Sequence, residues 1–276
     1  MADFNSIAGV LSGCAVGFSL GLIGGGGSVL ATPLLLYVVG AQPHVAIGTS
    51  AFAVSVNAYV GFLSHARART VRWRAAVLFA SIGIIGATFG SSLGKALDGR
   101  RLITLFAVAM VGVGVGMLRI GKRQDAQTCR QEEKAGGAVD LRVAILAFLT
   151  GFAAGFFGIG GGIFVVPALM LATGMEMVNA VGSSLLAVGT LGLTTAINYA
   201  ASGMIDWKLA LEFIAGGLVG AFSGMRVAVH LGANKAALRR VFAAVILVVA
   251  GYVIFRSHVE SLATAHVRSS MSKSKY

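Results

Sequence analysis

The sequence predicts an all-α polytopic membrane protein built from two homologous repeats of about five helical segments each. Its composition is the first reason, because 57% of the residues are hydrophobic and only 12% are charged, whereas soluble domains carry about 25% charged residues. The second reason is that long apolar runs, such as 102–118 and 241–255, recur along the chain. These runs are continuous, whereas a transmembrane β-barrel requires alternation of apolar and polar residues.

The third reason is an internal repeat with an offset of 134 residues. Its first part pairs Gly17, Phe18, Gly21, Gly24, Gly26, Gly27 and Pro33 with Gly151, Phe152, Gly155, Gly158, Gly160, Gly161 and Pro167. The same offset then pairs Gly40, Gly48, Ser50, Trp73, Gly83, Gly86 and Gly90 with Gly174, Gly182, Ser184, Trp207, Gly217, Gly220 and Gly224. Duplicated hydrophobic halves interrupted by glycine at matching positions are typical of transporters whose site lies between the halves.

The apolar pattern predicts five helical segments in each half. The first half contains segments at about 4–23, 28–40, 45–65, 73–96 and 101–119. The second half contains segments at about 142–157, 162–174, 178–200, 207–230 and 237–256. The second segment of each half has about thirteen residues and reaches only about 20 Å, less than the roughly 30 Å hydrocarbon core. It is therefore either a shortened helix that meets the first segment at depth or a re-entrant one.

The expected organisation is a first membrane repeat at 1–120, a charged cytoplasmic linker at 121–140, a second membrane repeat at 141–257 and a basic disordered tail at 258–276. No cleavable signal peptide is expected, because the chain begins without a basic leader. Cys14 and Cys129 are expected to be unpaired thiols without a catalytic task.

The formal net charge of +12 indicates membrane topology and not nucleic-acid binding. Basic residues gather in short connections, as Arg67, Arg69, Arg72 and Arg74 show, and cytoplasmic loops carry such an excess. If each short second segment crosses the membrane, the second repeat is inverted and the basic tail lies outside. If it is re-entrant, the repeats are parallel and the tail lies inside. We favour inverted repeats because duplicated transporters commonly use them.

The glycine-rich break after the first segment of each half is the first candidate for substrate binding. Four glycines in five positions should interrupt a helix, since each is about 1 kcal/mol less favourable than alanine there. A break at membrane depth persists only where it is buried in protein or lines a wet cavity. Its free N–H groups and the following helix dipole favour an anion. The candidates are Gly24, Gly26, Gly27 and Ser28, with Gly158, Gly160, Gly161 and Gly162. The alternative is a close helix crossing that requires glycine.

The polar start of the third segment supplies a second set of candidates. Thr49 and Ser50 match Ser183 and Ser184, and small hydroxyls donate to an oxyanion without the cost of a buried charge. The alternative is that these hydroxyls bond back to their own helix. Asn57 and Asn198 extend this polar line, and hydrogen bonding between helices is the alternative role for both.

Enzyme chemistry, a metal site and a cofactor are not expected. The sequence offers no Ser/His/Asp set at depth, no HExxH and no CxxC. Few carboxylates fall within apolar segments, Glu212 being the main one, so a buried proton relay is hard to assign. Trp73 and Trp207 start matching segments and are expected to be interfacial anchors. Glycines spaced by four, such as Gly13, Gly17 and Gly21, form stripes for static packing or for sliding.

At these residues the chain resembles the TauE/SafE sulfite exporter family, also called the toluene-sulfonate uptake permease family. The resemblance covers about residues 5–256 and rests on the duplicated pattern more than on any single motif. It is carried by Gly21–Gly27, Pro33, Gly48–Ser50, Val71–Trp73 and Gly83–Gly90, together with Gly155–Pro167, Gly182–Ser184, Ile205–Trp207 and Gly217–Gly224. It implies transport of sulfite, sulfonates, sulfoacetate or related organosulfur anions.

Together these observations predict a secondary transporter of small, sulfur-containing anions that works by alternating access between two repeats. The expected location is the bacterial inner membrane, crossed several times. The expected partners are a small anionic substrate and the lipid bilayer, and no nucleic acid; a coupling ion (H⁺ or Na⁺) and a homodimer are left open. An anion channel and a non-transporting membrane assembly partner are the alternative functions.

Overall fold

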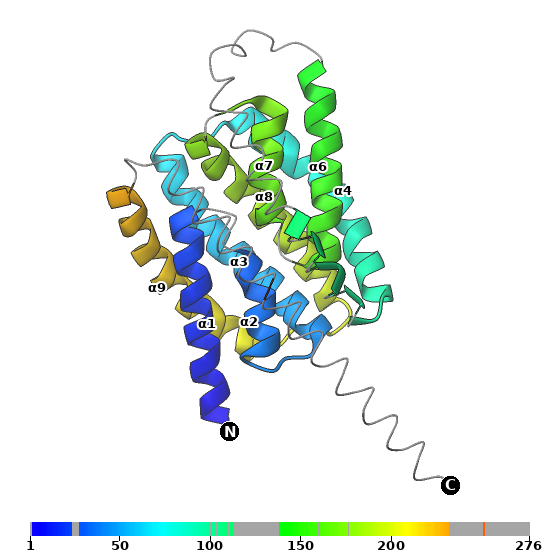
Figure 1. Cartoon of the computed structure of the whole chain (residues 1–276), viewed down its shortest axis with the longest axis vertical. Coiled ribbons are helices and arrows are strands. Elements are labelled where there is room, and N and C mark those ends of the chain that lie inside the picture. Colours follow the sequence, from blue (N-terminus) through cyan, green and yellow to red (C-terminus); the bar gives the residue numbers. More distant parts are fainter. Residues whose placement is uncertain are drawn as a thin grey trace.

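The structure, a computed structural model, is a bundle of helices (Figure 1). It describes residues 2–23, 28–99, 101–102, 104–106, 108–109, 111–112, 138–158, 161–175, 177–231 and 251. The helices assigned within these residues are α1 (Ala2–Ile23), α2 (Ala31–Tyr37), α3 (Pro43–Arg67), α4 (Trp73–Ala96), α6 (Ala138–Phe157), α7 (Gly162–Thr173), α8 (Met177–Ala200) and α9 (Trp207–Leu231). The described residues contain no strand, which confirms the all-helical prediction for this part of the chain.

The helix bounds follow the predicted segments closely, with two differences. Residues 28–30 form a 3₁₀ turn, so α2 is shorter than the predicted segment 28–40. It stops before Gly40, whose φ of 77° only glycine adopts readily. In the second half α6 begins at Ala138, a turn earlier than expected and inside the predicted linker, because extending an existing helix costs little per residue. Most of the linker, the tail and most of the two fifth segments lie outside the described residues.

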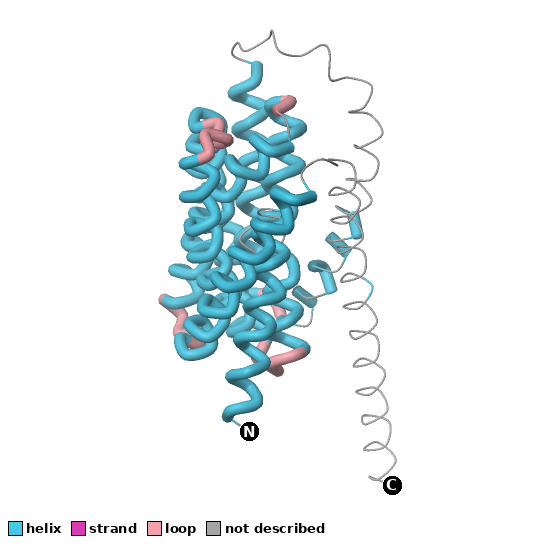
Figure 2. Tube along the Cα trace, turned by 90° about the vertical axis from the view of Figure 1, so that its left-hand side faces the viewer, coloured by secondary structure: helices cyan, strands magenta, loops and turns pink. Residues whose placement is uncertain are grey.

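Contacts between helices fix their relative directions. Gly13 and Gly17 of α1 lie against Phe213 and Gly217 of α9, so these two helices run parallel. Gly86 and Gly90 of α4 lie against Phe148 and Phe152 of α6 in the same sense. In contrast, α3 and α8 are antiparallel, because Gly48 meets Tyr199 whereas Gly182 meets His65. Figure 2 shows the helices packed along a common axis.

The two ends of the bundle differ in the loops and helix termini that they carry. The arginine-loop end carries the loop 68–72 between α3 and α4 and the start of α6. The Lys95 end carries the starts of α1, α3 and α9 and the ends of α4 and α8. As a result α1, α3 and α4 each run opposite to the helix 134 residues later, which is α6, α8 and α9 respectively.

Glycine stripes allow two of the helix pairs to pack backbone against backbone. A Cβ on Gly17 would overlap the carbonyl oxygen of Gly217, and a Cβ on Gly220 would overlap that of Cys14. Between α4 and α6, Gly90 is equally tight against the carbonyl of Phe152, and Gly155 against that of Ala87. Such close approach gives van der Waals contact between helices where the hydrophobic effect supplies no drive.

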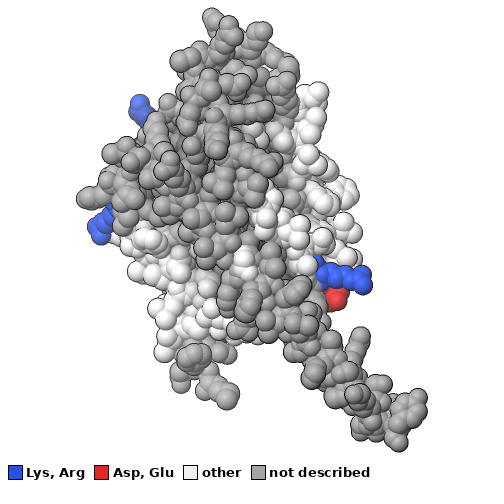
Figure 3. Space-filling view, viewed as in Figure 1, with Lys and Arg blue, Asp and Glu red and all other residues white. Residues whose placement is uncertain are grey.

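The bundle is apolar outside and contains buried hydroxyls inside. Leu211, Val219 and Phe89 are 64–68% exposed, whereas Thr49, Ser50, Ser183 and Ser184 are fully buried. On the face in Figure 3 the described charged side chains lie at the margins. Within the described residues, three helices are long and apolar enough to cross a membrane: Pro43–Arg67, Trp73–Ala96 and Val178–Ala200. Four shorter apolar helices accompany them.

Candidate functional site

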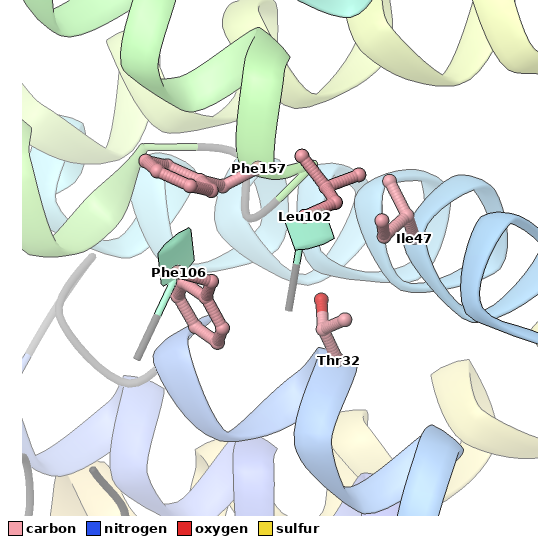
Figure 4. A pocket seen from close by; sticks show the side chains of 5 residues that line it. All are labelled: Thr32, Ile47, Leu102, Phe106 and Phe157. Carbon is pink, nitrogen blue, oxygen red and sulfur yellow. The ribbon is translucent and has the colours of Figure 1, made fainter. Parts of the chain in front are cut away.

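A small pocket near the Lys95 end is the starting point for the site (Figure 4). It is a shallow, partly open depression whose interior has room for about one water molecule. Its lining comes from several parts of the chain and consists of Thr32, Ile47, Leu102, Phe106 and Phe157. Four of these side chains are apolar, so the Thr32 hydroxyl is the polar group that a ligand would meet there.

A pair of hydroxyls holds α2 on α3 beside this pocket. The oxygens of Thr32 and Ser50 lie 2.9 Å apart, and both side chains are buried. Ser50 also lies 3.1 Å from the carbonyl oxygen of Ile47 and can donate to it. A serine carries one hydroxyl hydrogen, so Ser50 donates either to Ile47 or to Thr32. When it donates to Thr32, the hydrogen of Thr32 is available to a ligand in the pocket.

The glycine break between α6 and α7 lies directly next to the pocket. Gly158 follows the lining residue Phe157, and a Cβ on Gly158 would overlap Cγ2 of Ile47. Gly158 and Gly161 have φ of 68° and 78°, values at which L side chains are disfavoured. The carbonyl of Gly161 accepts hydrogen bonds of 2.9 Å from the N–H groups of Phe164 and Val165, so Gly161 caps the start of α7.

Four of the glycine candidates lie outside the described residues. They are Gly24, Gly26 and Gly27 of the first break and Gly160 of the second. Ser28 is fully buried where the 3₁₀ turn before α2 begins. Gly162, the first residue of α7, is also buried.

Thr49 and Ser183 make the same contact at opposite ends of the bundle. Thr49 Oγ1 accepts a hydrogen bond of 3.1 Å from the backbone N–H of Asp206, just before α9. Ser183 Oγ accepts one of 2.9 Å from the backbone N–H of Arg72, just before α4. Each hydroxyl therefore attaches one half of the chain to a loop of the other half.

The structure does not bring the two hydroxyl sets together. Gly48 lies beside the end of α8, and Gly182 lies beside His65, seventeen residues further along α3. At 1.5 Å per residue this is a separation of about 25 Å. Ser184 donates to the carbonyl of Val181 at 2.8 Å, which is the local helix bonding considered from the sequence. Of these hydroxyls, Ser50 is the one beside the pocket.

Asn57 lies deeper in the bundle, seven residues after Ser50 on the same face of α3. Its side chain is 2% exposed, and its amide nitrogen and oxygen have no hydrogen-bond partner among the described residues. A Cβ on Gly217 of α9 would overlap this amide nitrogen. The residue 134 positions later is Leu191, which packs against Gly83 in the matching place.

Asn198 belongs to a different polar cluster, at the end of α8. Its side-chain oxygen accepts from Lys95 of α4, and its amide nitrogen donates to Ser91 at 2.6 Å and Ser92 at 3.0 Å. This is the hydrogen bonding between helices that the sequence offered as the alternative role. Asn198 is therefore separate from the hydroxyl pair beside the pocket.

Sequence reasoning missed Thr32 and Lys95. Thr32 is the one aliphatic hydroxyl in the apolar α2 (ATPLLLY), and the repeat gives no sign of it because its counterpart is Val166. Lys95 is a lone cation near the end of the apolar α4, a position that could have flagged it because charges in such segments are costly. In the described ranges no three His, Cys, Asp or Glu side chains gather as metal ligands.

Comparison with known proteins decides the family. The model of the sulfite exporter TauE/SafE family matches residues 9–253. The chain belongs to this family. A probable membrane transporter protein of Xylella fastidiosa strain 9a5c is 53% identical over 247 residues, 89% of this chain and 94% of the relative. No solved structure matches the chain.

More distant TauE/SafE relatives carry similar names. The probable membrane transporter protein YunE of Bacillus subtilis is 25% identical, over 79% of this chain and 86% of its own length. The protein MJ0441 of Methanocaldococcus jannaschii, named in the same way, is 31% identical over 57% of this chain and 60% of its own length. This protein is thus a membrane transporter of the TauE/SafE family.

Proposed function

We propose that this transporter moves a small sulfur-containing anion, such as sulfite, sulfoacetate or a sulfonate, by alternating access in the bacterial inner membrane. The observation that carries the proposal is the glycine break between α6 and α7, which lies against the pocket through Phe157 and Ile47. The start of α7 offers backbone N–H groups and the positive end of a helix dipole. The Thr32 hydroxyl adds a neutral donor on the opposite wall.

A pocket whose hydrogen-bond donors are uncharged suits an anion that must leave again. A buried cation would hold an oxyanion tightly through a charge-assisted hydrogen bond, whereas hydroxyl and amide donors bind it more weakly. The described residues that line the pocket include no charged side chain. Asn57, unpaired on the same face of α3, offers a further donor along the path into the bundle.

The opposed directions of matching helices support an alternating-access mechanism. Each of α1, α3 and α4 runs opposite to its counterpart in the second half, which is the arrangement of inverted repeats. Inverted repeats give inward-open and outward-open states of similar energy, because each half can adopt the conformation of the other. The basic residues of loop 68–72 favour the arginine-loop end as cytoplasmic, so the pocket lies toward the outer side.

Uptake into proteoliposomes tests the proposal. Purified protein should give saturable flux of radiolabelled sulfite, sulfoacetate or taurine that competes with unlabelled anion. Gly161→Val, which places a branched side chain at a left-handed φ beside Ala154, should abolish flux; Gly61→Ala, where a Cβ meets only Leu185 side-chain atoms at 3.4 Å and beyond, should not. Absence of saturable flux with all three anions would refute the sulfur assignment.

A further inference from the structure

A second polar cluster lies at the Lys95 end, behind the wall of the pocket. Lys95 Nζ donates to the backbone oxygen of Asn198 at 3.0 Å, to its side-chain oxygen, and to Ser202 Oγ at 2.9 Å. All three acceptors are neutral. Among the described residues no carboxylate lies within ion-pair distance of Lys95. The ammonium charge is therefore solvated locally but not neutralised.

Two unpartnered polar atoms accompany this charge. The Tyr199 side chain is fully buried, and its ring centre lies 5.9 Å from Lys95 Nζ. Its hydroxyl has no hydrogen-bond partner within the part of the chain that the structure describes. The ring of His44 lies 6.4 Å from that of Tyr199, and its Nδ1 is likewise buried without a partner. A buried hydroxyl without a partner is unfavourable, so a ligand that satisfies it would bind favourably.

The cluster is continuous with the pocket. Tyr199 packs with Ile47, Leu102 and Phe156 in one hydrophobic cluster, and Ile47 and Leu102 also line the pocket. Tyr199 thus belongs both to the hydrophobic cluster that includes Ile47 and Leu102 and to the group around Lys95 and His44. An anion that travels between the pocket and the Lys95 end would pass a cation, a phenol and an imidazole.

We propose that Lys95, Tyr199 and His44 form an anion-binding station that takes the substrate oxyanion before it reaches the pocket or after it leaves. The station rests on the proposed function and adds a second, charged site to it. An oxyanion that displaces Ser202 as an acceptor takes a charge-assisted hydrogen bond from Lys95. It also accepts the hydroxyl hydrogen of Tyr199. The competing explanation is structural: Lys95 is a cation at the C-terminal end of α8, where it satisfies the carbonyl of Asn198.

The two explanations differ for Tyr199→Phe. This substitution removes only an unpartnered hydroxyl, so a purely structural Tyr199 predicts unchanged or higher thermal stability and unchanged transport. The station predicts a rise of about tenfold in the half-saturating sulfite concentration for proteoliposome uptake, the effect of one lost hydrogen bond to a charged group. Tyr59→Phe, in the interface between α3 and α8, is the matched control and should transport sulfite like the wild type.

Lys95 variants complete the test. Lys95→Met should raise the half-saturating sulfite concentration about tenfold or more, and Lys95→Arg, which keeps the charge, should recover part of the loss. If wild-type protein transports sulfite and both Tyr199→Phe and Lys95→Met match its half-saturation, the station is refuted while the proposed function stands. If wild-type protein shows no saturable flux with any of the three anions, both fail. Should Lys95→Met not fold, Tyr199→Phe alone decides.

Discussion

Asn57 is a buried polar residue whose side-chain amide has no hydrogen-bond partner among the described residues. A leucine occupies the matching position in the second half and packs against Gly83, so the fold accepts an apolar side chain there. Asn57 instead places an unpartnered amide against Gly217. Burying an amide without a partner destabilises a protein, and this cost needs a compensating role. Contact with a passing anion is the role that we propose.

Replacing Asn57 by leucine separates stability from function. Removal of the unpaired amide should raise the free energy of unfolding by about 1–3 kcal/mol, visible as a higher midpoint of thermal unfolding in detergent. Sulfite flux in proteoliposomes should fall. The reciprocal variant Leu191→Asn places the same amide in the other half and should lower the midpoint. A lower midpoint for Asn57→Leu would show that Asn57 has a partner in the folded protein and would contradict the argument.

Gly158 affects both the backbone conformation of the α6–α7 break and the shape of the pocket, because it lies against the lining residue Ile47. Gly158→Ala should destabilise the protein for two reasons: φ of 68° costs an L residue about 1–2 kcal/mol, and its Cβ would overlap Ile47. Ile47→Ala removes the overlap but not the backbone strain. The double variant should therefore lose less stability than the two single variants summed, with a coupling above about 0.5 kcal/mol. Additive midpoints of thermal unfolding would show that Ile47 does not contact the break.

At the scale of helices, glycine sets how closely α1 approaches α9 and α4 approaches α6. Gly17→Ala should lower the midpoint of thermal unfolding, because its Cβ would overlap backbone of Gly217 that cannot rotate away. Forced separation of packed elements typically costs about 1–3 kcal/mol. Gly61→Ala is the matched control, since its Cβ would meet only the flexible end of Leu185 at 3.4 Å. Equal midpoints for the two variants would refute close backbone packing at Gly17.

The helices could be predicted from the sequence because their determinants are local. Trp73–Ala96 matches the predicted segment 73–96, since an apolar run bounded by polar residues defines a membrane helix by itself. Thr32 and Ser50 pair across eighteen residues, and Tyr199 packs beneath Lys95 across 104. Such partners follow from tertiary packing, which the repeat pattern does not encode. The repeat even concealed Thr32, because it occupies a position where the other half has the apolar Val166, whereas the polar Asn57 could be singled out from the sequence.

At the scale of the whole molecule, the contacts between helices bear on whether the two repeats are inverted or parallel. The distribution of charged residues left both arrangements open. The short α7 starts beside Ile47, near the Lys95 end, and leads to α8, which starts at the arginine-loop end. Its twelve residues span about 18 Å, about half the length of the 24-residue α8, so α7 returns only part of the way across the bundle. Because α6 and α8 both start at the arginine-loop end, the chain comes back between them. This return, together with the opposed directions of α1 and α6, supports the inverted repeats that we propose.

Cysteine accessibility tests this reversal directly. In a background with Cys14 and Cys129 replaced by serine, single cysteines at Ala2 and Ala138 mark the starts of α1 and α6. Because these starts lie at opposite ends of the bundle, a membrane-impermeant maleimide should modify position 2 in right-side-out vesicles and position 138 only in inside-out vesicles. Cysteines at the exposed Ala201 and Ala68 give reference patterns for the Lys95 end and the arginine-loop end. Modification of positions 2 and 138 from the same side would mean parallel repeats, and alternating access by exchange of inverted halves would then be excluded.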